Sequence, residues 1–317
     1  MGKSPPTRAR GAAAYGPRAS ALLLFCFCVL AGTARASELK RATAAAFAHY
    51  VELTEARMAR EVDDPGGFLW VDRLPPQRRR EVLAQLRQED VVTATLETFE
   101  NGQPIPVPDG LVHHWVATVF VRGVHLASVV AEQQDYARDA DILGPDIQRS
   151  KVLNADGNHF LVYFRLYRKV FVTATYNADF DIRYTPVDAK HEYSRSHSTR
   201  IAEVVKAGQP DEHERPIGND HGYLWELDTY MRYEERDGGV YIQVEFVGLS
   251  RSVPAIFAWL VNPYVKSVPQ DYLTHILGAT RQDLMRRVEA DVHHNDGGAA
   301  GAPVASQTRQ PVSSPAR

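Results

Sequence analysis

Residues 239–249 read Gly-Val-Tyr-Ile-Gln-Val-Glu-Phe-Val-Gly-Leu, and residues 271–288 read Asp-Tyr-Leu-Thr-His-Ile-Leu-Gly-Ala-Thr-Arg-Gln-Asp-Leu-Met-Arg-Arg-Val. The first stretch is rich in β-branched and aromatic residues, which predicts a strand. The second stretch has helical periodicity, and its apolar stripe comprises Leu273, Ile276, Leu277, Thr280, Leu284 and Val288. The folded part of the chain is therefore expected to close with a long helix that has one face to bury.

Further strand-like segments precede this pair. They lie at 148–153, 159–168, 170–184, 190–204 and 223–234, and are separated by turn residues. Earlier in the chain, 68–71 and 113–121 have strand composition, and 37–64 and 124–142 show helical spacing. A run of strands that ends in a long helix predicts an α+β fold of the helix-grip kind, in which one curved antiparallel β-sheet wraps around the C-terminal α-helix. The helix at 37–64 is an extra N-terminal element.

Both ends of the chain are expected to lie outside the folded domain. Residues 1–36 combine a basic start, an apolar run at 21–31 and the small-x-small site Ala34-Arg-Ala36, which predicts a secretory signal peptide cleaved after Ala36. Residues 293–317 are poor in large apolar side chains, so we expect a disordered tail. The domain itself is then expected at 65–292, after a helical extension at 37–64.

The composition excludes several classes of function. The only two cysteines, Cys26 and Cys28, leave with the signal peptide, so thiol chemistry and disulfides are excluded from the mature chain. The formal charge falls from −3 to −8 because residues 1–36 contain five basic residues and no acidic ones, which argues against nucleic-acid binding. No catalytic or phosphate-binding motif is present, and His113 and His114 point to opposite faces of a strand. We therefore expect no metal and no cofactor.

Four local motifs carry a resemblance to a known superfamily. They are Gln134-Asp-Tyr136, Gly144-Pro-Asp-Ile-Gln-Arg-Ser150, Gly238-Gly-Val-Tyr-Ile-Gln-Val-Glu245, and Leu249-Ser-Arg251 followed by Pro254. With the order of elements over about residues 85–290, they resemble the helix-grip fold of the START-like (SRPBCC) superfamily, which includes polyketide cyclases, coenzyme-Q-binding proteins and birch-pollen-allergen-like proteins. The resemblance implies a cavity between sheet and C-terminal helix that holds a lipid or another apolar molecule.

The strands do not tell which face of the sheet would line that cavity. Along 159–168, Phe160 and Val162 alternate with Leu161 and Tyr163, and both sets are largely apolar or amphipathic. The second face is either covered by the N-terminal helix or lines the cavity. Arginines on or just after central strands can hold a carboxylate or phosphate there, can pair internally with Glu226, Asp228 or Glu245, or can lie exposed on the convex face. We expect at least two of Arg165, Arg200, Arg232 and Arg251 to share a cavity with Tyr163 or Tyr230.

The candidate ligand-binding residues are Tyr163, Arg165, Arg200, Tyr230, Arg232, Glu245, Arg251, Phe257 and Trp259. Phe257 and Trp259 either gate the cavity and touch lipid, or belong to the core. The favoured function is a secreted or periplasmic protein that binds an apolar small molecule or lipid, with possible transient membrane contact. Two alternatives stay open: a structural or interaction module whose cavity is filled by side chains, and a cyclase- or hydrolase-type enzyme that uses the same cavity.

Overall fold

The computed structural model describes residues 37–64, 67–169, 173–252 and 269–290. The predicted signal peptide and the predicted C-terminal tail lie outside these ranges, as do the candidate residues Phe257 and Trp259. Within them, no helix is long and apolar enough to cross a membrane.

The elements follow the predicted order. The helices are α2 (Arg41–Val62), η1 (Trp70–Arg73), α3 (Pro76–Arg87), α4 (Leu126–Gln133), η2 (Tyr136–Arg138), α5 (Asp139–Ile142) and the closing helix at 269–290. The strands are β1 (Ser37–Glu38), β2 (Val92–Thr95), β3 (Phe99–Glu100), β4 (Gln103–Pro104), β5 (Gly110–Arg122), β6 (Ile147–Asp156), β7 (His159–Lys169), β8 (Thr173–Pro186), β9 (His191–Val205), β10 (His213–Glu214), β11 (Asn219–Asp220), β12 (Glu226–Arg236) and β13 (Gly239–Arg251).

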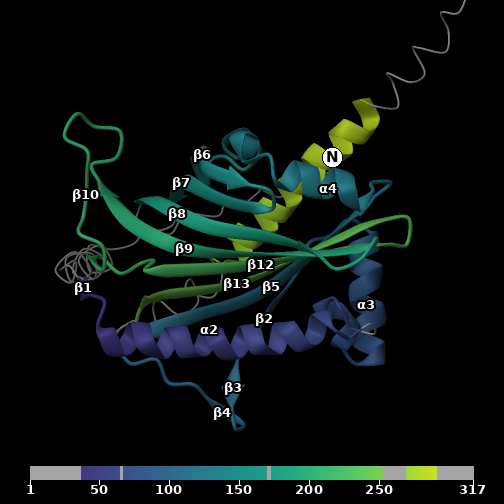
Figure 1. The fold of residues 1–317 in the computed structure, drawn as a ribbon, viewed down its shortest axis with the longest axis horizontal. Helices are drawn as coiled ribbons and strands as arrows, with labels where there is room; N and C mark the ends of the chain where they lie inside the picture. The colour runs from purple at the N-terminus through teal and green to yellow at the C-terminus, as the bar shows by residue number, and fades with distance from the viewer. Residues whose placement is uncertain (1–36, 65–66, 170–172, 253–268, 291–317) are drawn as a thin grey trace, which may run out of the picture.

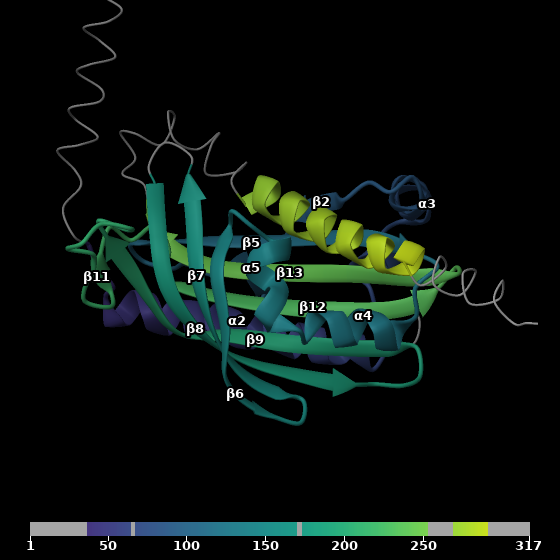
Figure 2. The ribbon, with the colours of Figure 1, turned by 90° about the horizontal axis from the view of Figure 1, so that it is seen from above.

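One large antiparallel sheet organises the molecule. Its order is β2-β5-β13-β12-β9-β8-β7-β6, and β10 adds to β9. The closing helix lies across one face of this sheet, and α2 runs along the other (Figures 1 and 2). The predicted fold, a curved antiparallel sheet with a C-terminal helix and an extra N-terminal helix, is confirmed.

Strand alternation gives the two faces different partners. Trp115, Val119 and Ile242 belong to the cluster that contains Leu273 and Leu277 of the closing helix. We call this side of the sheet the interior face. The intervening residues of the same strands form the α2 face, which buries α2 side chains spaced by three and four positions. These α2 side chains are Thr43, Phe47, Tyr50, Thr54, Met58 and Glu61.

Two sequence-based expectations about local structure were wrong. Residues 68–71 do not form a strand: Trp70 begins the short helix η1, and its N–H donates to the side-chain Oε1 of Gln243 on β13 at 2.6 Å instead of to a strand backbone. The single helix expected at 124–142 is divided into α4, η2 and α5. It divides because Asp135, with φ −85° and ψ 60°, leaves the helical region.

Candidate functional site

The interior face is apolar across all the long strands. Its core includes Ala117, Val119, Val121, Val162, Phe164, Ala178, Phe180, Ile182, Val240, Ile242 and Val244. Aromatic rings contact one another within it, as between Phe164 and Phe180, whose centroids are 5.7 Å apart. Leu273, Leu277 and Leu284 of the closing helix are at most 2% exposed against this surface. This is the largest apolar cluster among the described residues.

Buried tyrosines bring hydroxyl groups into this apolar region. Tyr184 donates to the carbonyl oxygen of Gln133 at 2.9 Å, and Tyr136 therefore donates to the Tyr184 hydroxyl, also at 2.9 Å. Burial raises the pKa of Tyr184 and of Tyr233, which lies beside it. The hydroxyl of Tyr176 is buried and has no hydrogen-bond partner among the described residues. The interior thus contains a phenol whose hydrogen-bonding capacity is unused.

Tyr176 lies at the end of the sheet where β8 begins and β13 ends. There the guanidinium of Arg251 lies over the ring of Tyr223, 5.5 Å from its centroid. Burial, Glu203 and Asp220 raise the pKa of the Tyr176 phenol, and the charge of Arg251 opposes that rise. Tyr176 lies opposite Glu203 of β9, and Glu203 contacts the ring of His221, which stacks on Tyr223 with the ring centroids 5.5 Å apart. Tyr176 and Arg251 therefore lie at the same end of the sheet. We call the group Tyr176, Tyr223 and Arg251 the Arg251 cluster.

Three of the predicted ligand-binding residues face α2 instead of the closing helix, which corrects the sequence expectation. Tyr230, Arg232 and Glu245 occupy positions of β12 and β13 that alternate with the interior positions, so their side chains lie beneath α2. Arg232 donates to Oε2 of Glu61 at 2.8 Å and to the carbonyl oxygen of Phe68 at 2.6 Å. Burial lowers the pKa of Arg232, and Glu61 opposes this.

Glu245 is the centre of a buried polar chain under α2. It accepts from Nε2 of His114 at 2.7 Å and from Arg57. The hydroxyl of Tyr50 lies 2.8 Å from Nδ1 of His114 and accepts from the N–H of Thr98 at 2.8 Å. All these bonds are satisfied when Nε2 of His114 carries the proton and Tyr50 donates to Nδ1. The chain therefore attaches the N-terminal helix to the sheet.

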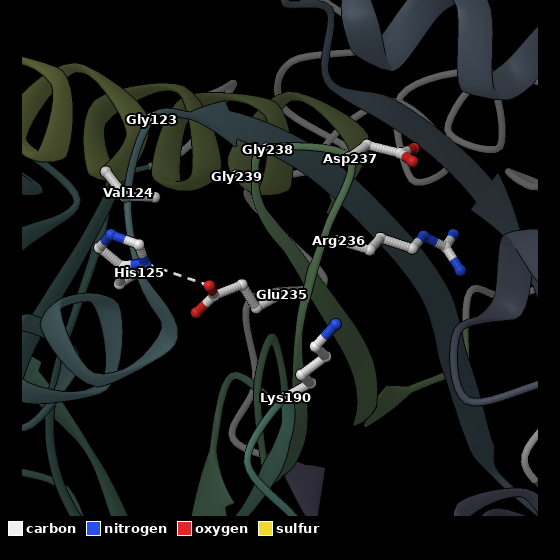
Figure 3. A pocket seen from close by; sticks show the side chains of 9 residues that line it. All are labelled: Gly123, Val124, His125, Lys190, Glu235, Arg236, Asp237, Gly238 and Gly239. Carbon is white, nitrogen blue, oxygen red and sulfur yellow. Dashed lines mark hydrogen bonds and ion pairs between the residues drawn. The ribbon is translucent and has the colours of Figure 1, made fainter.

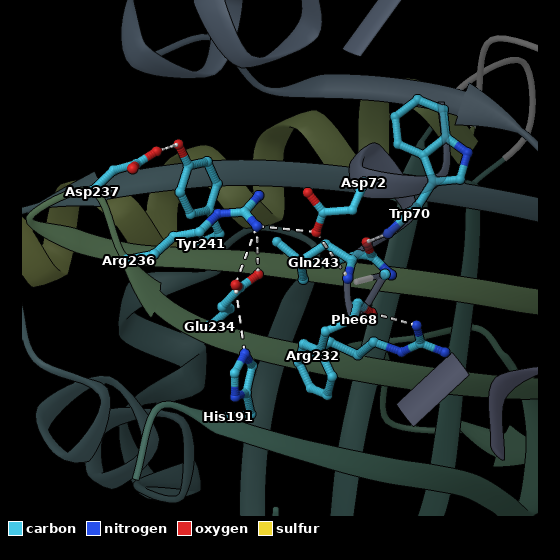
Figure 4. Close-up of polar contacts among 12 residues, drawn as sticks. Phe68, Trp70, Asp72, His191, Arg232, Glu234, Arg236, Asp237, Tyr241 and Gln243 are labelled. Carbon is cyan, nitrogen blue, oxygen red and sulfur yellow. Dashed lines mark hydrogen bonds and ion pairs between the residues drawn. The ribbon is translucent and has the colours of Figure 1, made fainter. Parts of the chain in front are cut away.

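A second polar group connects η1 to the same face (Figure 4). Arg236 donates to Asp72 at 3.0 Å and to Glu234 at 3.1 Å, and its guanidinium lies over the ring of Tyr241, 4.7 Å from the centroid. Nε2 of His191 is 3.5 Å from Glu234. These charges are paired with one another, so the seam between η1 and the strands is a structural contact.

Tyr163, Arg165 and Arg200 also lie away from the interior. Arg165 makes a bidentate pair with Glu212, at 2.8 Å for both bonds, and Arg200 pairs with Glu214. Arg165 holds the pKa of Glu212 at about 2. Of these arginines, Arg165 meets Tyr163 through a shared acceptor, Oδ1 of Asn177, whereas Arg200 is connected to Asn177 only through Glu214. They gather on the outer side of β7 and β8, where glutamates neutralise them, and not in a ligand cavity.

Two pockets stand out in the described part of the chain, and neither lies beneath the closing helix. The larger, about 290 Å³, is formed by Gly123–His125, Lys190 and the β12–β13 hairpin (Figure 3). Its Glu235 accepts from the N–H of Leu126 at 2.7 Å, which lowers its pKa, and contacts His125 at 3.1 Å. The smaller, about 180 Å³, lies between α2 and β9–β12 and includes Glu55, Arg195, Tyr230 and Arg232. No metal-ligand cluster occurs among the described residues.

Sequence reasoning missed the interior tyrosines. Tyr176 and Tyr184 share the two-residue period of Ala178, Phe180 and Ile182 on β8, so the pattern already places them on one face. That period was the available signal. Of the predicted residues that are described, Arg251 lies at the same end of the sheet as Tyr176, whose hydroxyl has no partner among the described residues.

No family model matches the chain, and no curated protein matches it. Among solved structures it is similar to a STAR-related lipid transfer protein fragment from Xanthomonas axonopodis (15% identity, TM-score 0.40, covering 61% of this chain and 98% of that one). It is also similar to the Zhui aromatase/cyclase from Streptomyces (14%, 0.40, 56% and 96%) and to a START superfamily protein from Mycobacterium smegmatis (10%, 0.35, 56% and 97%). At TM-scores of 0.40 and below, these likenesses carry no argument about superfamily, ligand or activity.

Proposed function

We propose that the mature chain is a secreted or periplasmic binding protein that holds an apolar small molecule, such as a lipid, against the interior face. The observation that carries this proposal is the set of buried tyrosines on an otherwise apolar surface. If the interior served packing alone, the buried hydroxyl of Tyr176 would only destabilise the fold, because a buried hydroxyl without a hydrogen-bond partner costs free energy. A bound molecule with a polar group gives that hydroxyl a partner.

Native mass spectrometry of the mature chain, purified from its secreting compartment, tests this function. We expect an adduct of lipid-like mass that is lost on denaturation and recovered by organic extraction. A clean mass of the protein alone is followed by titration with a fluorescent fatty-acid or sterol probe. Binding of the probe supports the proposal, and failure of both measurements rejects it.

Compartment and processing are proposed from the sequence of residues 1–36. N-terminal sequencing of the chain recovered from the periplasm or medium is expected to begin at Ser37. Recovery of the full-length chain from the cytoplasm alone contradicts secretion without affecting the proposed binding.

A second function is favoured by one observation: both prominent pockets lie outside the interior, and aromatic side chains contact one another within it. This arrangement suits a structural or interaction module with a filled interior. Such a module binds neither probe. A cyclase or hydrolase needs titratable groups in the interior, and the strongly perturbed His197 lies beneath α2 instead.

A further inference from the structure

The position of Arg251 depends on a neighbouring glycine. The N–H of Arg251 donates to the carbonyl oxygen of Gly222 at 2.7 Å. Cβ and Cδ of the Arg251 side chain lie against the position that a side chain of Gly222 would occupy. A Cβ atom at Gly222 would lie 2.9 Å from Cβ of Arg251 and 2.9 Å from Cζ2 of Trp225. The absence of a side chain at Gly222 therefore lets Arg251 lie across the end of the sheet and over Tyr223.

The acidic groups near Arg251 already have other partners. Glu203 accepts from the N–H of His221 at 2.9 Å and contacts its ring. Asp220 accepts from the N–H of Gly222 at 2.6 Å and from Nε1 of Trp225 at 3.1 Å. Among the described residues Arg251 has no ion pair, and the sequence of 253–268 contains no Asp or Glu. A guanidinium of this kind has its donors available for an anion.

The same cluster joins the apolar interior to the surface. Tyr176 belongs to the core beneath the closing helix, and its hydroxyl has no partner among the described residues. It lies opposite Glu203, which contacts His221, and the His221 ring stacks on the Tyr223 ring that supports Arg251. Tyr223, which supports the guanidinium, is 37% exposed. A molecule with an apolar chain in the interior would thus present its head group to one cation and one phenol near solvent.

We propose that the ligand of the interior is an amphipathic carboxylate, whose chain lies against the interior face and whose carboxylate is bound by Arg251 and Tyr176. The arginine supplies paired N–H donors that match the two carboxylate oxygens, and the tyrosine supplies an O–H donor. This inference rests on the proposed function and specifies its ligand class.

The test compares three fluorescent probes with the same polyene chain: the carboxylate, its methyl ester and the corresponding primary alcohol. Binding to the delipidated full chain is titrated at pH 8, where a carboxylate is ionised. The variants are Arg251→Gln, Tyr176→Phe and the control Arg183→Gln, which removes an exposed arginine from the opposite end of β8. Circular dichroism confirms that each variant is folded.

We expect the wild-type chain to prefer the carboxylate to the ester by about tenfold, and Arg251→Gln to abolish that preference without weakening ester binding. Tyr176→Phe should weaken carboxylate binding by a few-fold, and Arg183→Gln should change nothing. Equal affinity for carboxylate and ester, or equal losses for both probes in Arg251→Gln, overturns the carboxylate assignment and leaves the binding function intact. Failure of all three probes to bind overturns both.

Discussion

Nε2 of His197 on β9 lies 3.2 Å from Oε1 of Glu55 on α2, so a single imidazole joins the N-terminal helix to the sheet. The other ring nitrogen, Nδ1, lies 2.8 Å from Asp228 on β12. Tyr230 donates to Glu55 at 3.1 Å, and Arg195 lies 3.6 Å from the same carboxylate. The hydrogen bonds to Asp228 and Glu55 raise the pKa of His197 to about 9, and the bond from His197 lowers the pKa of Glu55. His197 is therefore a protonated bridge at neutral pH.

This bridge predicts a loss of stability in mild alkali. The pKa of His197 is raised from 6.5 to about 9 in the folded protein. The stabilisation that protonated His197 gives the folded state is therefore complete below pH 6.5 and is lost as the pH rises through 9. We expect a decrease of ~1 kcal/mol in the free energy of unfolding, reduced by solvent screening because the side chain is 38% exposed. Urea unfolding at pH 6.5, 8 and 9.5 measures it. The variant His197→Gln should lack this decrease, and parallel profiles for both chains would contradict the prediction.

The buried carboxylate of Glu245 gives a second prediction. Glu245→Gln removes the charge that Arg57 and His114 contact at a site only 2% exposed, so we expect the free energy of unfolding to fall by about 3 kcal/mol. Ligand affinity should not change, because the residue lies on the α2 face. The control Glu89→Gln removes a carboxylate that is 63% exposed and pairs with Arg281, and should cost less than about 0.5 kcal/mol. A stable Glu245→Gln chain that has lost ligand binding would place Glu245 in the binding site instead.

The fold could be predicted from the sequence because alternation and helical stripes are local. The repeated two-residue period of 159–168 and the stripe from Leu273 to Val288 each require one face to be buried, whatever covers it. Which element covers that face is determined by the tertiary structure. Arg232 pairs with Glu61, 171 positions away, and no local pattern reveals that α2 provides this partner.

The candidate site was accordingly predicted only in part. Arginines and tyrosines were chosen for their chemistry, and most of them face α2 or the outer side of β7 and β8. Both faces of β7 contain large side chains. One face packs in the interior, and on the other face Tyr163 bonds to Asn177 of the neighbouring strand β8. Tyr176 follows the apolar period of β8 and could have been placed with its neighbours. That its hydroxyl has no hydrogen-bond partner among the described residues could be recognised only from the tertiary structure around Arg251.

Gly222 provides a third prediction, for which the chain offers a matched control. Gly222 has φ +70° and no room for a Cβ beside Arg251, whereas Gly157 has φ +56° and nothing within 4 Å of that position. Gly157→Ala should therefore cost only backbone strain, about 1 kcal/mol. Gly222→Ala adds a steric clash, so we expect a total cost of about 2–3 kcal/mol together with weaker carboxylate binding. Thermal unfolding and probe titration measure both effects, and equal behaviour of the two variants would show that the Arg251 cluster tolerates movement.

Two tyrosines on the same strand distinguish a satisfied hydroxyl from an unsatisfied one. The hydroxyl of Tyr184 bonds to Tyr136 and to the carbonyl oxygen of Gln133, so Tyr184→Phe should lower the free energy of unfolding by about 1–2 kcal/mol. The hydroxyl of Tyr176 has no partner among the described residues, so Tyr176→Phe should leave the delipidated chain unchanged or up to about 1 kcal/mol more stable.

Urea unfolding of the delipidated chain measures both Phe variants. If Tyr176→Phe were as destabilising as Tyr184→Phe, the Tyr176 hydroxyl would have a protein partner in solution. Its availability to a ligand would then be contradicted. The expected result, a neutral substitution that nevertheless weakens carboxylate binding, separates a group retained for binding from one retained for folding.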